Sequence, residues 1–375
     1  MNKINLNKQI IMIILILFLW VTHNLCAQEW GDVNTDNSVN IIDALLVAQY
    51  YVGLDPSPFN VNVADVGGDG AINIVDALLI AQFYVGLIDH FPVSETTPEP
   101  TPVPGDDETL NDMPSEYRSA LDWIWTNRIV NEGSTVRRNL IFDQIYAGNG
   151  ELHYCIRWQS SISVTLGERQ EITSMISRQI KNWTKHLTNY DGWPYDDVAV
   201  IVVSWACVNS SLLHDLQDNE IVYTDWINDP LHNENSSIPI ELPVGPSTCS
   251  RFDHFTDSNY TYSSCPGGSQ NRFDMYLWGT TNFGGGAGGD WGQRMGDSYI
   301  LNNSTGNEVT IIEHEIGHGF GLTDFYGENE RPPGGFPVPT IMWAGNSATI
   351  TDFDKWMLRY VWSQIKNDTN RFPPQ

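Results

Sequence analysis

The sequence predicts two folded parts: a small all-α domain, and after it an α+β domain that combines a mixed sheet with a buried helix and a C-terminal helix. Three observations indicate this fold class. Residues 31–89 contain an internal repeat, residues 92–113 are rich in proline, threonine and glutamate, and residues 114–375 alternate apolar strand-like runs with helical patterns. A chain of 375 residues is long enough for both parts.

The chain is strongly acidic. It carries 19 lysine and arginine residues against 46 aspartate and glutamate residues, which gives a formal net charge of −27. This charge argues strongly against nucleic acid and anionic membrane surfaces as partners, because both repel an acidic protein. An acidic excess fits instead with calcium binding and with solubility outside the cell.

The N-terminus has the pattern of an export signal. Two lysines precede an apolar run over residues 10–21, and Ala27 provides a small residue at the cleavage position. We therefore expect a signal peptide at residues 1–27 and a secreted, extracellular chain that begins at Gln28. No membrane span is expected after cleavage, since the run is shorter than the roughly 20 residues that a span requires. The alternative is a retained anchor, including lipid attachment at Cys26.

Removal of the signal leaves four cysteines in an exported chain, which favours two disulfides. Of the three possible connectivities, we expect Cys249–Cys265, which closes a short polar loop, and Cys155–Cys207, which links two predicted strands. Zinc binding by these cysteines is disfavoured, because no two of them are spaced C-x-x-C.

The first domain is a duplicated unit of one loop and one helix, and its second copy begins 33 residues after the first, at Asp65 against Asp32. Both loops place oxygen atoms at the offsets of a calcium-binding loop, and we therefore expect two Ca²⁺ ions. The predicted ligands of the first ion are Asp32, Asn34, Asp36, the carbonyl group of Ser38, and Asp43. Those of the second ion are Asp65, Asp69, the carbonyl group of Ala71, and Asp76, with Gly67 at the third position. Acidic surface turns are the alternative interpretation.

Two such loops, each followed by one helix and closed by aspartate at position twelve, resemble a dockerin module. The resemblance implies that residues 28–91 need calcium to fold and bind a cohesin domain on a scaffoldin or cell-surface protein, in an extracellular, cellulosome-like complex. Positions ten and eleven are Ile41-Ile42 and Ile74-Val75, where some dockerins carry a Ser-Thr pair. These pairs either form an apolar recognition face or belong to the core.

A proline-rich spacer separates this module from the larger domain. Residues 92–113 cannot bury a core and are expected to be extended. Apolar periodicity then predicts strands at 151–158, 198–208 and 272–278, and helices at 116–129, 167–187 and 351–366. The glycine-rich residues 283–290 precede no phosphate-binding lysine or helix, so we expect a mobile loop at the edge of a cleft instead of a nucleotide site.

The chemistry is concentrated in the stretch EVTIIEHEIGHGFGLTDFY. Its apolar spacing predicts a buried helix on which His314 and His318 lie one turn apart on the same face, the pairing that a tetrahedral zinc ion requires. Glu315 lies between them, where a general base can reach water on the metal. Gly321 lets the helix end and the chain turn back, which brings Asp324 round as the third ligand.

This H-E-x-x-H-x-x-G-x-x-D pattern resembles the metzincin-like zinc metallopeptidases whose third ligand is aspartate. The resemblance implies a zincin-like catalytic domain with one catalytic Zn²⁺, a methionine-bearing turn at Met342 beneath the metal, and a strand at 272–278 beside the substrate cleft. The last predicted helix contains no glutamate, which disfavours zincins that take their third ligand from a downstream helix. Asp352 and Asp354 are the alternatives to Asp324, although helix capping accounts for both.

The predicted function is that of a secreted zinc-dependent endopeptidase, tethered by its dockerin to a cohesin-bearing complex, that hydrolyses a protein or peptide substrate. In this hypothesis His314, His318 and Asp324 hold zinc, while Glu315 takes a proton from water and delivers it to the leaving amine. The alternative is a polysaccharide-binding or glycan-modifying component of the same complex, with a structural or vestigial zinc site. A third hypothesis is an adaptor that acts only through its dockerin.

Overall fold

The chain divides into two compact units, with the division between Thr101 and Pro102. The computed structural model describes residues 30–36, 38–54, 56–67, 72–88, 90–91, 108–133, 139–233, 237–257 and 259–373. The expected signal peptide and residues 92–107 of the expected spacer lie outside these ranges. Within these ranges, no helix combines the length and the apolar character that a membrane crossing requires.

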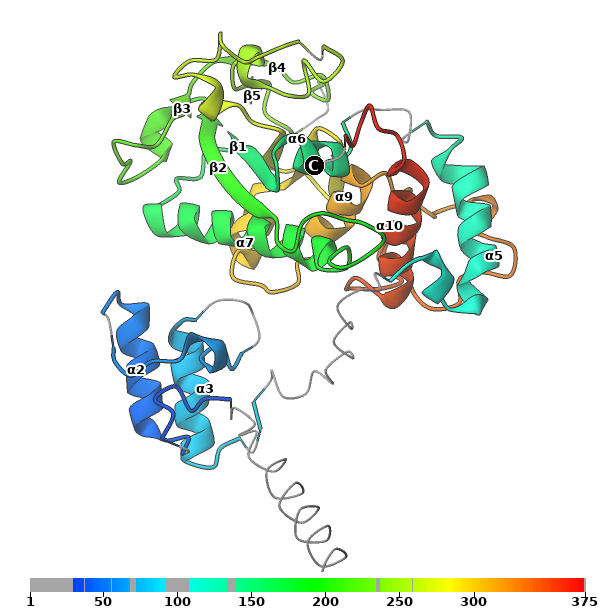
Figure 1. The fold of residues 1–375 in the computed structure, drawn as a ribbon. Coiled ribbons are helices and arrows are strands. Elements are labelled where there is room, and N and C mark those ends of the chain that lie inside the picture. Colours follow the sequence, from blue (N-terminus) through cyan, green and yellow to red (C-terminus); the bar gives the residue numbers. More distant parts are fainter. Residues whose placement is uncertain are drawn as a thin grey trace, which may run out of the picture. The chain divides into compact units, whose positions relative to one another are not determined.

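The described part of the first unit contains two helices, α2 (Ile41–Tyr51) and α3 (Ile74–Tyr84), with a short 3-10 turn, η1 (Val61–Val63), between them in sequence (Figure 1). Both helices begin in the same way. The side chain of Asn40 or Asn73 caps the first turn, and an aspartate three residues later accepts a hydrogen bond from the N–H of that asparagine. The helices pack on a small core whose fully buried members are Val33, Val47, Ala64, Val66 and Ile80.

The second unit is built on a six-stranded sheet with the strand order β3-β2-β1-β6-β8-β7. The strands are β1 (Glu151–Gln159), β2 (Ala199–Cys207), β3 (Val222–Tyr223), β6 (Met275–Thr280), β7 (Gly286–Gly289) and β8 (Gly292–Gly296). Neighbouring strands are parallel except β7 and β8, so the expected mixed sheet is confirmed. Because the sheet is mainly parallel, the domain is of the α/β class and not of the α+β class that the sequence predicts. A separate antiparallel pair consists of β4 (Trp226–Asn228) and β5 (Glu241–Pro243).

Helices pack on this sheet and on each other. Helix α7 (Leu166–Thr184) connects β1 to β2 and contacts α9 (Thr310–Gly319), which also contacts β7 and β8 (Figure 1). Among the described residues of this unit, the other helices are α5 (Ser115–Ile124), its π-helical continuation η3 (Trp125–Ile129), α6 (Ile141–Ala147), α8 (Asp297–Asn303) and α10 (Asp352–Ile365). Short 3-10 turns lie at η2 (Leu110–Asp112), η5 (Ser210–Leu212), η6 (Ser247–Cys249), η7 (Ser269–Asn271) and η8 (Glu328–Glu330). Large aromatic side chains fill the core, including Phe142, Trp158, Trp183, Phe320 and Phe353.

The strand beside α9 is not the one that the sequence indicates. The segment predicted to border the cleft, 272–278, contributes to β6, which lies inside the sheet between β1 and β8. The glycine-rich segment predicted as a loop forms the edge strand β7, which packs on α9. Glycine permits this contact, because a Cβ atom added to Gly288 would lie 2.2 Å from the backbone oxygen of Glu315.

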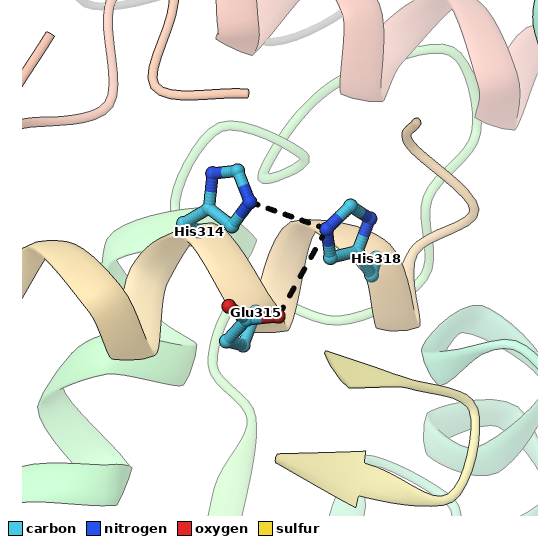
Figure 2. A group of neighbouring side chains, drawn as sticks. All are labelled: His314, Glu315 and His318. Atoms are coloured by element: carbon cyan, nitrogen blue, oxygen red, sulfur yellow. Dashed lines mark hydrogen bonds and ion pairs between the residues drawn. The ribbon is translucent and has the colours of Figure 1, made fainter. Parts of the chain in front are cut away.

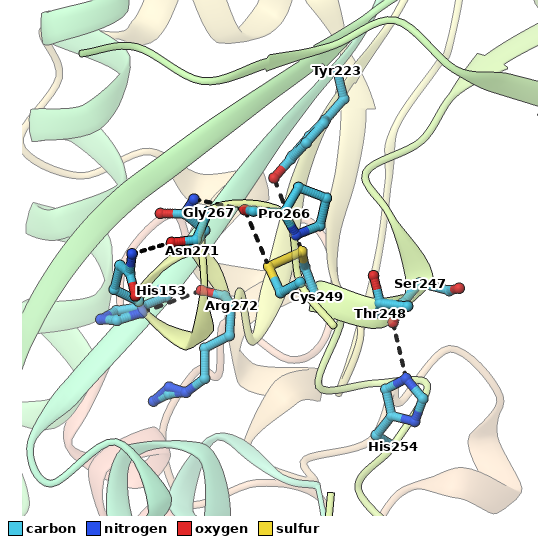
Figure 3. Close-up of a disulfide and its surroundings, with 12 residues drawn as sticks. His153, Tyr223, Ser247, Thr248, Cys249, His254, Pro266, Gly267, Asn271 and Arg272 are labelled. Carbon is cyan, nitrogen blue, oxygen red and sulfur yellow. Dashed lines mark hydrogen bonds between the residues drawn. A yellow bond between two sulfur atoms is a disulfide. The ribbon is translucent and has the colours of Figure 1, made fainter. Parts of the chain in front are cut away.

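One of the two expected disulfides is present. Cys249 and Cys265 are bonded, with an S–S distance of 2.01 Å (Figure 3). The predicted Cys155–Cys207 bond is wrong, since both residues are buried free thiols. In the pairing of β1 with β2, Cys155 is opposite Ser204, three residues before Cys207. An odd offset places the two thiols on opposite faces of the sheet, where they cannot bond.

Candidate metal centre

Helix α9 carries the H-E-x-x-H residues. Its buried side is formed by Ile312 and Ile316, which fix the rotation of the helix. His314 and His318 therefore project from one face, with Glu315 beside them (Figure 2). One ligand atom from each of these three side chains lies within 4.8 Å of the other two. The structure thus brings together the residues that the sequence pattern predicts.

Backbone carbonyl groups hold both imidazole rings. Nδ1 of His314 lies 2.7 Å from the carbonyl oxygen of Ile341, and Nδ1 of His318 lies 2.9 Å from that of Leu322. A carbonyl oxygen only accepts hydrogen bonds, so each Nδ1 carries a proton and each neutral ring presents a lone pair at Nε2. The two Nε2 atoms face each other at 3.2 Å. Two lone pairs at this distance repel unless a proton or a metal ion lies between them.

Asp324 joins the two histidines. Gly321 has a φ of 89°, the left-handed conformation that lets the chain turn back after α9. Oδ1 of Asp324 then lies 3.1 Å from Nε2 of His314 and 3.6 Å from Nε2 of His318. Two imidazole nitrogens and one carboxylate oxygen converge, and this donor set fits a zinc ion with one further position for water or substrate.

The charges of this group are coupled. Burial alone would raise the pKa of the Asp324 carboxyl, but the adjacent imidazoles of His314 and His318 hold that pKa well below its usual range. Burial opposes a positive charge on His314, yet its hydrogen bonds to Asp324 and to the Ile341 carbonyl raise the pKa of this imidazole. In the metal-free protein a proton thus holds the group together, and a metal ion must displace that proton to bind.

Glu315 lies beside the ligands without joining them. It is 5% exposed, and its Oε2 atom lies 3.9 Å from Nε2 of His318. Burial raises the pKa of this carboxyl, and the two nearby imidazoles only partly oppose the shift. A carboxylate with a raised pKa accepts a proton from water more readily than an exposed one, which suits a general base.

A methionine-bearing turn packs on α9, as the sequence predicts. A Cβ atom added to Gly317 would lie 2.4 Å from the sulfur of Met342, so the turn lies directly against the helix between the two histidines. Arg331 links this turn to the loop of Asp324. Its Nε donates to the carbonyl oxygen of Phe325 at 3.0 Å, and its guanidinium lies 3.8 Å from the ring centre of Trp343. No sequence motif indicates this role of Arg331.

The two other aspartates that the sequence offers as a third ligand have different roles. Asp352 is exposed on the first turn of α10. Asp354 is fully buried and accepts hydrogen bonds from the Thr340 hydroxyl and, at 3.0 Å, from the N–H of Ile341. Because the carbonyl group of Ile341 holds the ring of His314, Asp354 orients a ligand through the intervening turn.

The loops of the first unit gather carboxylates in a way that fits calcium. Asp43 is fully buried, and its Oδ1 accepts a hydrogen bond from the N–H of Asn34 at 3.2 Å. Oδ1 of Asp32 accepts from the N–H of Asp36 at 3.0 Å. Burial, together with the nearby charges of Asp32 and Asp36, raises the pKa of the Asp43 carboxyl. A bound cation removes this repulsion, so the arrangement suits a Ca²⁺ ion.

The second loop repeats part of this arrangement. Asp76 is 1% exposed, and its Oδ1 accepts a hydrogen bond from the N–H of Gly67 at 2.9 Å. Asp43 accepts in the same way from Asn34, the equivalent residue of the first loop. Asp69 and Ala71 lie outside the described residues. The predicted carbonyl ligand of the first loop, Ser38, accepts a hydrogen bond from the Asn40 amide at 3.1 Å.

Comparison with known proteins identifies the first unit. Residues 30–83 match the family model described as Dockerin type I domain. No curated protein and no solved structure matches the chain. Dockerin domains bind calcium and cohesin, and they occur in extracellular cellulosome components. The dockerin domain therefore indicates tethering to a cohesin-bearing, cellulosome-like complex, which fits a secreted protein.

The apolar pairs of the dockerin domain lie on its surface. Ile41, Ile42, Ile74 and Val75 are each exposed over about half of their area, at 51%, 52%, 51% and 51%. They are therefore not core residues, which decides between the two interpretations that the sequence leaves open. An apolar recognition face is consistent with their position.

Proposed function

We propose that this chain is a secreted zinc-dependent endopeptidase that its dockerin domain attaches to a cohesin-bearing complex. The observation that supports the proposal is the convergence of two imidazole lone pairs with a carboxylate oxygen. Oδ1 of Asp324 lies within 3.6 Å of Nε2 in both His314 and His318, and the buried Glu315 lies beside them. This combination suits hydrolysis of a carbonyl compound better than a purely structural site, because a structural zinc site has four protein ligands.

The residues of the chain have separate roles in this proposal. A bound zinc ion would supply Lewis acidity to water and to the substrate carbonyl group. The carbonyl oxygens of Ile341 and Leu322 keep protons on both Nδ1 atoms, which keeps the Nε2 lone pairs available. A carboxylate oxygen of Glu315 accepts the proton of the attacking water and later donates it to the departing amine.

Strand β7 offers a place for an extended peptide. It is the terminal strand of the sheet, and it packs against α9 at Glu315. A terminal strand has one edge outside the ladder of its sheet, and an extended peptide can pair with such an edge through backbone hydrogen bonds. A glycan has no backbone that forms this ladder, so the position of β7 favours a peptide substrate.

The cohesin partner binds the exposed apolar side chains of the dockerin helices. Residues at equivalent repeat positions are exposed to the same extent, as Leu45 and Leu78 are at 56%. Large apolar side chains that gather on a surface mark an interaction site. The exposed apolar residues are Ile41, Ile42 and Leu45 on α2, and Ile74, Val75 and Leu78 at the equivalent positions of α3.

The proposal is tested by incubating the full chain with casein, before and after a chelator removes zinc. We expect cleavage to stop on chelation and to return when zinc is added. The Glu315→Gln variant should bind zinc and cleave nothing, while Asp352→Asn, a surface change on α10, should behave as wild type. Cleavage that survives chelation, or an active Glu315→Gln variant, contradicts the proposal.

The same preparation separates the other functional classes. Among the described tryptophans only Trp30 and Trp226 are exposed, at 36% and 48%, so few ring faces are available for stacking on a polysaccharide. Metal-independent retention of the chain on insoluble cellulose supports a polysaccharide-binding component. Cohesin binding without hydrolysis of casein supports an adaptor.

A further inference from the structure

The carboxylate of Glu315 lies directly against the backbone of β7. A Cβ atom added to Gly286 would lie 2.2 Å from Oε1 of Glu315 and 2.7 Å from its Cδ atom. Both distances are shorter than a van der Waals contact, so no side chain fits at this position while the carboxylate stays where it is. The absence of a side chain at Gly286 therefore leaves the room that the carboxylate occupies.

The next glycine on the same face of β7 makes a different contact. A Cβ atom on Gly288 would lie 2.2 Å from the backbone oxygen and 2.7 Å from the Cα atom of Glu315, so a side chain there would push the strand off α9. At Gly286 the obstacles are the end of the Glu315 side chain and, at 2.7 Å, Cγ2 of Ile311. A methyl group at Gly286 can thus be accommodated by moving side chains, and the carboxylate is the group that must move.

We propose that Gly286 is a positioning residue that acts through Glu315. The bare backbone of β7 forms a wall that holds the carboxylate next to His318 and covers its other side, which accounts for its burial. The proposal rests on the proposed peptidase function, in which Glu315 is the base. A base held by a wall stays aligned with the reacting water, and alignment within about 1 Å is worth roughly 100-fold in rate.

The test uses the full chain and four variants. Gly286→Ala introduces the clash. Gly284→Ala is the matched control, because a Cβ atom there meets nothing within 4 Å and the residue does not have a left-handed backbone. Glu315→Asp shortens the acid by one methylene group, which withdraws the carboxylate from the wall. The double variant, Gly286→Ala with Glu315→Asp, measures whether the two positions are coupled.

We expect Gly286→Ala to lower kcat for a fluorogenic casein-derived peptide by about 100-fold, with KM and the zinc dissociation constant unchanged. Gly284→Ala should match the wild type. In the Glu315→Asp background the same Gly286→Ala change should have little further effect on kcat. The thermal unfolding midpoint of the zinc-free chain should fall in Gly286→Ala and recover in part in the double variant, because the shorter acid removes the clash with the carboxylate and leaves only that with Ile311.

Equal losses from Gly286→Ala in the two backgrounds would overturn the proposal, as would wild-type kcat in Gly286→Ala. A loss of zinc affinity in Gly286→Ala would also overturn it, because the glycine would then support the metal ligands and not the base. If the wild-type chain cleaves no peptide, the peptidase function fails. The unfolding midpoints still decide whether Gly286 and Glu315 are coupled.

Discussion

Nε2 of His314 and Nε2 of His318 face each other at 3.2 Å, while the Nδ1 atom of each ring is held by a backbone carbonyl group. This relationship leaves two lone pairs opposed in a site that is mostly buried. A proton or a cation is required to stabilise it. The behaviour of the site therefore depends on which of the two is present.

Asp324 should contribute to zinc affinity, and Asp352 should not. Replacing Asp324 by Asn removes the anionic ligand but keeps the size of the side chain, so we expect zinc affinity to fall on the order of 100-fold or more. Competition with a fluorescent chelator measures this change. The control, Asp352→Asn, alters an exposed residue of α10 and should bind zinc as the wild type does. Equal affinities in the two variants would exclude Asp324 as a ligand.

Zinc affinity should fall as the pH falls. The pKa of His314 is raised in the metal-free protein, so below that pKa the imidazole is protonated and zinc must compete with the proton. Above the raised pKa the affinity should level off, and below it the affinity should drop by about tenfold for each pH unit. Titration with zinc between about pH 5.5 and 8.5, from roughly one unit below to two units above an ordinary imidazole pKa, checks this. An affinity that does not change over this range speaks against the assignment.

Asp354 should influence the metal without touching it. Its carboxylate accepts from the N–H of Ile341, whose carbonyl group orients His314. In Asp354→Asn one acceptor becomes a donor, the turn shifts, and zinc affinity should fall by about 10- to 100-fold. The variant Thr351→Ala is the comparison, because it removes the hydroxyl that caps α10 and donates to Asp354 but leaves the carboxylate that accepts from the N–H of Ile341. If both variants lose stability but neither loses zinc affinity, Asp354 serves only as a helix cap.

Glu313 should make stability depend on pH. Burial raises its pKa from 4.5 to about 7, so the folded chain binds a proton between these values that the unfolded chain does not. The free energy of unfolding should therefore increase as the pH falls from 7 towards 4.5, because the folded chain takes up a proton at Glu313. We expect Glu313→Gln to be more stable than wild type at pH 8, by about 1–3 kcal/mol, and no more stable at pH 4.5.

Denaturant unfolding with a chelator present measures the effect of Glu313, since zinc is then removed from the comparison. Glu328→Gln, a change at an exposed glutamate, is the control; it keeps Glu313 and should therefore keep the pH dependence of the wild type. A Glu313→Gln variant that gains nothing at pH 8 would show that Glu313 is not held protonated by the fold.

Calcium removal should act on the dockerin domain alone. Without the ion, the buried Asp43 and Asp76 retain repelling or unsolvated charges, so α2 and α3 should lose their structure. Hydrogen exchange on the full chain, with calcium buffered to a low level and zinc kept saturating, measures protection of these helices. Protection of β1 in the second unit serves as the internal control. Unchanged protection in α2 would contradict a structural role of calcium.

The local parts of both sites could be predicted from the sequence. The spacing of His314 and His318 fixes their relation within one helix, and Gly321 permits the turn that brings Asp324 back, because all of these residues lie within eleven positions of one another. The two calcium-binding loops could be predicted in the same way, since the predicted ligands of each ion lie within one loop. Such features depend on backbone geometry over a few residues, which composition and spacing describe well.

Only the tertiary structure decided contacts between distant segments. The glycine-rich segment became the edge strand over Glu315, because only its lack of side chains lets a strand lie on α9. Cys155 and Cys207 remained apart because strand register, which no local pattern specifies, placed them on opposite faces. The sequence by itself determined which side chains can hold a metal ion, since their spacing is local. The surroundings of these side chains depend on the packing of β7 and of the turn before α10. These segments are distant in sequence and meet helix α9 only in the folded chain.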